Sequence, residues 1–97
     1  MEFEWDYEKN KRNIKIHNIR FETAMNVFKD EYRLEYFDEE HSQYEERYKT
    51  IGMVNGFITV ITVIYTNRKD VIRIISARKA NKEEREDYYD SKKKTRS

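Results

Sequence analysis

Two long apolar runs, residues 57–65 and 71–77, constrain the fold of this chain more than any other feature. Both are dominated by Ile, Val, Thr and Tyr, which suit a pleated, buried surface. The polar connector at residues 66–70 has hairpin length and contains Asn and Asp, which tolerate the backbone angles of tight turns. We therefore predict an antiparallel hairpin at the centre of a sheet. Its second strand would hold Arg73, Arg78 and Lys79 rigidly beside the core.

The remaining segments predict an α+β domain built around this hairpin. The carboxylate of Asp6 is placed to start one helix, and Asn81 with Glu84 forms a capping box that would start another. A second N-terminal helix is expected where apolar residues recur at i, i+3, i+4 and i+7, at Phe21, Ala24, Met25 and Phe28. The other predicted elements are strands at 2–5, 33–37 and 44–53, a tight return at 54–56, and helices at 7–17 and 82–91. The expected fold is a small antiparallel sheet with two N-terminal helices and one C-terminal helix on one face.

Length and charge limit the classes of protein to consider. The 97 residues suffice for one domain, which we place at residues 1–91, followed by a frayed basic tail at 92–97. The composition is 40% charged, but the apolar residues are clustered and periodic, which favours a folded chain. A net charge of +1 does not support a uniformly basic coat for nucleic acid. Residues 30–46 are strongly acidic, whereas the N-terminal part, the hairpin and the tail are basic, so the surface should be polarised.

Several kinds of site and location are disfavoured by the residues present. The chain has no cysteine, so it has neither disulfides nor a thiol nucleophile. His17 and His41 are far apart and have no ligand-spaced partner, so we expect neither a zinc site nor any cofactor. The first ten residues are acidic and aromatic, unlike a signal peptide, and no apolar run approaches the length of a membrane span. A cytoplasmic protein without membrane contact is the expectation.

Motifs along nearly the whole chain identify it as similar to the BrnT family of bacterial type II toxins. No single fragment is specific, but their order and spacing together are. The matching fragments are Phe3-x-Trp5-Asp6-x-x-Lys9-x-x-x-Asn13, His17-Asn18-Ile19-x-Phe21-Glu22-x-Ala24, Phe28-x-Asp30, His41-Ser42, Glu45-Glu46-Arg47-x-x-x-Ile51-Gly52, Arg73-Ile74-Ile75-Ser76-Ala77-Arg78-Lys79-Ala80, Glu84-Arg85 and Tyr88.

The resemblance implies a ribonuclease toxin with a fold similar to that of the RelE and ParE toxins. Such a toxin halts translation and growth and is neutralised by a BrnA-like antitoxin with a ribbon-helix-helix domain. The resemblance further implies that the two proteins form a dimeric assembly that contacts operator DNA only through the antitoxin. In one departure from the family pattern, Ile16 stands where the family commonly has a lysine directly before the histidine. Lys15 would have to replace that lysine from a different helical face.

Arginine side chains are the candidates for binding the RNA backbone. RNA is cut without a metal when its 2′-hydroxyl attacks the adjacent phosphorus, and the protein must then move protons and stabilise added negative charge. Arg47, Arg73 and Arg78 would clamp the phosphate, because a guanidinium matches phosphate oxygens with a planar fork. The alternative is that each pairs with one of the many carboxylates. Strict alternation places Arg73 and Arg78 on opposite strand faces unless the strand twists, bulges or ends between them.

His17 is the candidate for proton transfer, since its ordinary pKa is roughly 6.5. It is equally well explained as a cap at a helix C-terminus. His41 lies in an acidic loop and is interpreted as merely exposed, and Glu46 is either a base beside Arg47 or a solvated carboxylate.

Further substrate contacts are assigned to residues with cationic or aromatic side chains, namely Lys15, Lys79, Tyr65 and Tyr88. The leading hypothesis is thus a metal-independent ribonuclease. The alternative is a noncatalytic module that completes an antitoxin–DNA complex for autorepression.

Overall fold

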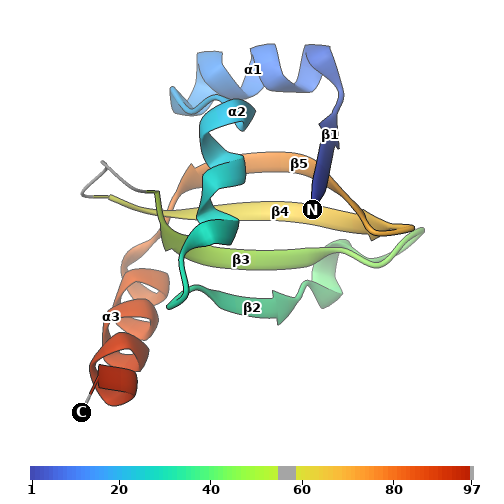
Figure 1. Cartoon of the computed structure of the whole chain (residues 1–97). Helices are drawn as coiled ribbons and strands as arrows, with labels where there is room; N and C mark the ends of the chain where they lie inside the picture. The colour runs from blue at the N-terminus through green and yellow to red at the C-terminus, as the bar shows by residue number, and fades with distance from the viewer. Residues whose placement is uncertain (55–58, 97) are drawn as a thin grey trace.

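The structure, a computed structural model, describes residues 1–54 and 59–96 and is built around one five-stranded sheet (Figure 1). The strands lie in the order β1-β5-β4-β3-β2, and three α-helices and two short 3-10 helices connect or flank them. The strands are β1 Glu2–Trp5, β2 Leu34–Phe37, β3 Tyr48–Met53, β4 Val60–Arg68 and β5 Val71–Lys79. The helices are α1 Tyr7–His17, α2 Phe21–Ala24, η1 Met25–Lys29, η2 Glu39–His41 and α3 Lys82–Arg96. This arrangement confirms an α+β domain.

The sheet is mixed, so the prediction of a wholly antiparallel sheet was wrong. Strand β1 runs parallel to β5, with Glu2 opposite Val71 and Trp5 opposite Ile74. The other strand pairs are antiparallel. Alternation within residues 2–5 gives the buried side of β1, but it carries no information about the direction of a partner nearly seventy positions away.

The central hairpin is confirmed, although its turn is shorter than predicted. Strand β4 continues to Arg68, so most of the expected connector is paired with β5. Only Lys69 and Asp70 form the turn, with φ values of 49° and 70°. Two left-handed residues are what a two-residue turn needs to match the twist of its strands. The expected strand start at residue 57 and most of the return at 54–56 lie outside the described residues.

The helices cover both faces of the sheet, which corrects the expectation that they share one face (Figure 1). On the α1 face, side chains from β4 and β5 such as Val63, Ile72 and Ile74 pack against Phe21 and Phe28 of the N-terminal helices. On the opposite face, which we call the α3 face, a second cluster consists of Ile51, Val60, Ala80 and Tyr88. None of the helices in the described parts of the chain is long and apolar enough to cross a membrane.

Helix α1 is held by buried amides rather than by an apolar stripe. Asp6 caps it as predicted, accepting hydrogen bonds from two backbone N–H groups, and Asn18 ends it with φ 56°. Its first residue, Tyr7, is 69% exposed and adds nothing to the core. The buried residues of α1 are Asn10 and Asn13.

These two asparagines attach α1 to β5 and to the start of α2. Asn13 donates to the carbonyl of Ala77 (2.8 Å) and accepts from its N–H (3.1 Å). Strand β1 pairs with β5 only as far as Ile74, so Asn13 occupies the place of a neighbouring strand at Ala77. Asn10 accepts from the N–H of Phe21 and donates to Glu22, which fixes the entry into α2.

Strand β5 contains a bulge that re-aims its charged residues. Ile64 pairs with Ser76, whereas the next residue, Tyr65, pairs with Ile74, so Ile75 is the extra residue. The bulge shifts the alternation by one position. Arg73 and Arg78 therefore lie on the same face, a condition for any site that uses both side chains.

Helix α3 begins with the predicted capping box and is longer than predicted. Glu84 N–H donates to the side chain of Asn81 (2.8 Å), and Asn81 N–H donates back to the Glu84 carboxylate (2.9 Å). The helix runs to Arg96, so residues 92–96 are helical rather than frayed. The second N-terminal helix has only one α-helical turn and continues as the 3-10 helix η1.

Candidate functional site

The α3 face of the sheet gathers the arginines proposed to bind phosphate. Directly opposed residues of neighbouring strands point to the same side. Thr66 is opposite Arg73 and Thr62 is opposite Arg78, which places both arginines on this face. Arg47 lies two residues before Lys49, and its carbonyl accepts from the N–H of Asp38 (2.8 Å), so it extends the β2–β3 ladder on the same side.

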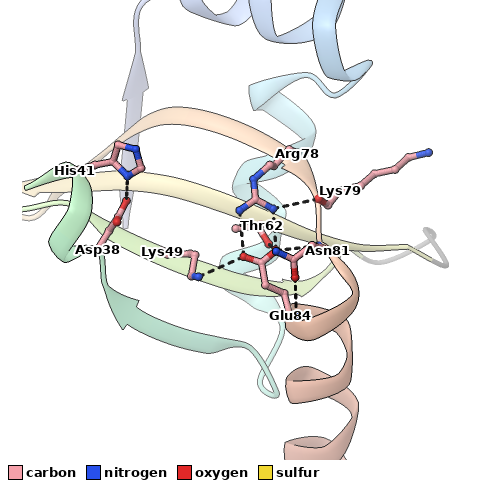
Figure 2. Close-up of polar contacts among 8 residues, drawn as sticks. All are labelled: Asp38, His41, Lys49, Thr62, Arg78, Lys79, Asn81 and Glu84. Atoms are coloured by element: carbon pink, nitrogen blue, oxygen red, sulfur yellow. Dashed lines mark hydrogen bonds and ion pairs between the residues drawn. The ribbon is translucent and has the colours of Figure 1, made fainter.

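A histidine held by a carboxylate lies at the end of strand β2. His41 Nδ1 is 2.9 Å from Asp38 Oδ2, and the imidazole is 55% exposed (Figure 2). Because Asp38 occupies Nδ1, the other ring nitrogen is left for a ligand. Ser42 fixes this segment, since its hydroxyl donates to the Asp38 carbonyl (2.6 Å) and accepts from the N–H of Arg47 (2.9 Å). A carboxylate that orients a histidine is a recurring arrangement in acid–base catalysis.

His41 and Arg47 line one open cavity of about 570 Å³. Arg47 Nε is buried and has no hydrogen-bond partner among the residues that the structure describes. Arg68 also lines the cavity and is bound to Glu45 through Nη2 (2.7 Å) and Nε (3.1 Å). The ring of Tyr44 at the rim is almost fully exposed. The remaining lining residues are Glu40, Gln43 and Glu45. The cavity thus combines an oriented imidazole, carboxylates, guanidinium groups and an exposed aromatic ring.

Arg78 is engaged in a structural network and is not available as a phosphate clamp in this conformation. Its two terminal nitrogens contact the two carboxylate oxygens of Glu84 at 2.7 and 3.1 Å (Figure 2). Lys49 (3.3 Å) and the hydroxyl of Thr62 (3.0 Å) bind the same carboxylate. Burial alone would raise the pKa of Glu84, but hydrogen bonds from Arg78, the Asn81 backbone and Thr62 outweigh it and lower the pKa to about 2. Arg78 therefore pairs with a carboxylate, which was the alternative to phosphate binding considered from the sequence.

Arg73 has a weaker partner. Its Nη1 is 3.2 Å from Glu4 Oε2, a single contact to a carboxylate of the edge strand β1 whose side chain is exposed. Exposed ion pairs of this type contribute little, about 0–1 kcal/mol, so Glu4 can be exchanged for a phosphate at small cost.

The side chains of His17 and Lys79 lie on the other face of the sheet from these arginines. Together with Arg20 they line a cavity of about 350 Å³ beside the end of α1. Lys79 is opposite Ile61, a residue of the α1 face, so the predicted site is divided between the two faces of the sheet. Lys15 and Ile16 are exposed on α1, and neither lines this cavity.

The two tyrosines predicted to contact substrate are buried in the cores. Tyr88 is fully buried and donates to Asp30 (2.6 Å), and Tyr65 is buried and donates to Glu35 (3.2 Å). Burial, together with the neighbouring carboxylates, raises the pKa of both hydroxyls. Only 7% of Tyr65 and 0% of Tyr88 is exposed, so their burial does not support a role in stacking.

The sequence contains a signal for the contact between Asp38 and His41, the histidine interpreted from the sequence as merely exposed. The spacing Asp38-x-x-His41 brings the two side chains together on one helical turn, as η2 provides. Glu46, the base considered earlier, instead accepts from the hydroxyl of Tyr48 (2.9 Å). No cluster of three or more His, Cys, Asp or Glu residues suited to a metal ion occurs within residues 1–54 and 59–96.

Comparison with known proteins agrees with the motifs found in the sequence. No curated protein matches the chain. A family model described as "Ribonuclease toxin, BrnT, of type II toxin-antitoxin system" matches residues 5–84, which include Asp38, His41, Arg47 and the arginines of β5. Such a family implies an antitoxin partner. Because the match covers well over half of its length, the chain belongs to the BrnT family of ribonuclease toxins.

Proposed function

We propose that this toxin cleaves RNA without a metal ion in the cavity lined by His41, Arg47 and Arg68. The observation that carries the proposal is the contact between Asp38 and His41, which lies beside a buried Arg47 nitrogen that lacks a partner in the described part of the chain. An oriented imidazole and a guanidinium that line one cavity provide both proton transfer and charge stabilisation at one place.

The reaction needs one base and one acid. The 2′-oxygen of the RNA forms a bond to the adjacent phosphorus, and the bond between phosphorus and the 5′-oxygen breaks. In our proposal Glu40 accepts the 2′-hydroxyl proton, and His41 donates a proton to the leaving 5′-oxygen. Asp38 stabilises the imidazolium before that transfer. The products are a 2′,3′-cyclic phosphate and a 5′-hydroxyl, and no water or metal enters this step.

The cavity also contains groups suited to hold the substrate. Arg47 would bind the non-bridging phosphate oxygens, on which negative charge increases in the transition state. Arg68 would join it by exchanging its exposed ion pair with Glu45 for the phosphate. Tyr44 presents an exposed ring on which a base can stack, an interaction of about 1–3 kcal/mol. Arg73 lies further along the same face and would bind a flanking phosphate in place of Glu4.

Finer expectations from the family resemblance are retained as part of the proposal. The expected partner is an antitoxin of the BrnA type with a ribbon-helix-helix domain, and the two proteins would form a dimeric assembly that reaches operator DNA through that antitoxin. The expected effect is inhibition of translation and growth in the cytoplasm. The expected fold is RelE-like. What supports them is the order of the family motifs along the chain.

The test is incubation of purified His41→Ala protein with total RNA, with and without its antitoxin. We expect cleavage to fall by about 10²–10⁴-fold, the usual contribution of a positioned acid or base. Asp38→Asn should cause a smaller loss, because the imidazole remains but is less well oriented. Lys29→Ala, an exposed change on η1, is the matched control and should cleave normally.

Two results would contradict the assignment. Full cleavage by His41→Ala, together with loss in His17→Ala, would return the catalytic role to His17. Absence of cleavage by the unmodified protein, with antitoxin binding intact, would favour the noncatalytic binding module.

A further inference from the structure

We propose that the cavity lined by His17, Arg20 and Lys79 is a second RNA-binding site, which takes a backbone phosphate outside the cleavage cavity. It differs from the proposed catalytic site in face and in position along the sheet. Lys79 ends β5 on the α1 face, whereas Arg47 and Arg73 lie on the α3 face near the other end of that strand. The inference rests on the proposed function only in taking RNA as the ligand.

Local structure brings the side chains of His17, Arg20 and Lys79 together. His17 is the last residue of α1, and Asn18, in the left-handed conformation, reverses the chain so that Arg20 precedes α2. Asn10 fixes the position of this turn, because its side chain accepts from the N–H of Phe21 (2.9 Å). Lys79 reaches the same cavity from the sheet, where it is paired with Ile61. The site is therefore built by two elements that the core holds in place.

The charge at this cavity is not balanced by acidic side chains. Its nine lining residues include no Asp or Glu, in a chain with 19 such residues. Within the described residues, the side chains of His17, Arg20 and Lys79 form no ion pair or hydrogen bond, in contrast to Arg68, Arg73 and Arg78. The acid near Arg20 in the sequence is Glu22, whose pKa is lowered by the hydrogen bond from Asn10 (2.9 Å) and, to a smaller extent, by the charge of Arg20, although the two side chains form no ion pair in the described structure. Attraction between exposed charges that are not in contact is weak, so Arg20 and Lys79 lose little when they bind an anion.

The walls of the cavity suit a nucleotide better than a bare ion. Ile19, Val54 and Ile61 form an apolar wall, and the side chains of Thr23 and Asn18 add polar groups. A volume of about 350 Å³ falls at the lower end of the range for small-molecule sites, enough for a sugar or base next to a bound phosphate. Phosphates with Lys or Arg supply most of the affinity of nucleic-acid complexes, independent of sequence.

The experiment measures RNA binding separately from cleavage. In a His41→Ala background, the affinity for a fluorescent single-stranded RNA is determined by anisotropy at several salt concentrations. We expect Arg20→Ala/Lys79→Ala to bind about 10–100-fold more weakly and to lower the salt slope by about 0.7 per lost phosphate contact. Lys29→Ala/Lys93→Ala removes the same charge from exposed positions outside both cavities and is the matched control. Arg20→Gln/Lys79→Gln repeats the test with side chains of more similar size.

Two outcomes would overturn the inference. One is a loss of affinity and salt slope no larger than in the Lys29/Lys93 control for both double variants. The other is unchanged RNA affinity with weakened binding of the antitoxin, which would identify the cavity as a protein contact. Residual cleavage by His41→Ala would contradict only the proposed catalytic site, because this second site is tested by binding.

Discussion

At the residue scale, single polar side chains determine much of this structure. They form hydrogen bonds and ion pairs with buried backbone and charged groups that the apolar cores cannot satisfy. Glu84 is the most connected of them. It caps α3 through Asn81 and binds Arg78, Thr62 and Lys49, and so it joins β3, β4, β5 and α3. The capping box was visible in the sequence, but the three partners of the carboxylate from the sheet were not, because they are brought there by strand pairing.

Replacing Glu84 with Gln should lower the free energy of unfolding by about 2–4 kcal/mol at neutral pH. Removing one partner of a buried ion pair costs about 3–5 kcal/mol, and the value is reduced here because Arg78 and Lys49 are partly exposed. Urea denaturation measures the change. Glu83→Gln, on the same first turn but without these contacts in the described structure, is the control and should unfold near the unmodified protein.

Glu84 also predicts how stability depends on pH. Its pKa is about 2 in the folded protein, below the ordinary value of 4.5, so its contribution is complete above about pH 4.5 and is lost as the pH falls towards 2. The stability difference between the unmodified protein and Glu84→Gln should therefore shrink over that interval. A difference that stays constant from pH 6 to pH 3 would show that the carboxylate charge is not what stabilises the network.

At the element scale, local sequence patterns predicted where helices and strands occur better than how these elements pack and pair with one another. The hairpin, the cap at Asp6 and the capping box at Asn81 all depend on neighbours in the sequence, and each is confirmed. The direction of β1 and the face covered by α3 depend on contacts distant in the sequence, and both were predicted incorrectly. The bulge at Ile75 has the same origin, since it exists only as a mismatch between two paired strands.

Asn13 provides a test of how α1 is attached to the sheet. Its side chain makes two hydrogen bonds to Ala77 and a third to the carbonyl of Ile19. Asn13→Ala leaves the buried N–H and carbonyl of Ala77 without these partners, and each unsatisfied group costs about 1–3 kcal/mol. We expect a loss of about 2–4 kcal/mol in urea unfolding. Asn26→Ala, which removes hydrogen bonds within one helical segment, should cost less. Equal losses would mean that Asn13 does not anchor the helix.

On the scale of the whole molecule, the cationic side chains are divided between the two faces of the sheet. The sequence indicated separate acidic and basic regions, but it placed His17, Arg47, Arg73 and Arg78 in one site. Folding separates His17 from the arginines. Strand β5 carries Arg73 and Arg78 on one face and Lys79 on the other, and His17 lines the same cavity as Lys79. The sequence could supply the residue types suited to RNA cleavage, whereas their grouping depended on the bulge, the register and the position of η2.

Two cationic sites on different faces predict that affinity depends on the length of the RNA. Arg73 and Lys79 are six residues apart along β5, or roughly 20 Å at the rise of a strand. An RNA of about 4 nucleotides should fill one site only, whereas one of about 20 should reach both, and the second contact then forms at high effective concentration. Anisotropy should therefore show that His41→Ala protein binds the longer RNA with higher affinity than the short one. Adding Arg20→Ala/Lys79→Ala should abolish this gain in affinity and change the affinity for the short RNA little. A length gain that persists in the double variant would mean that the longer RNA follows another path over the surface.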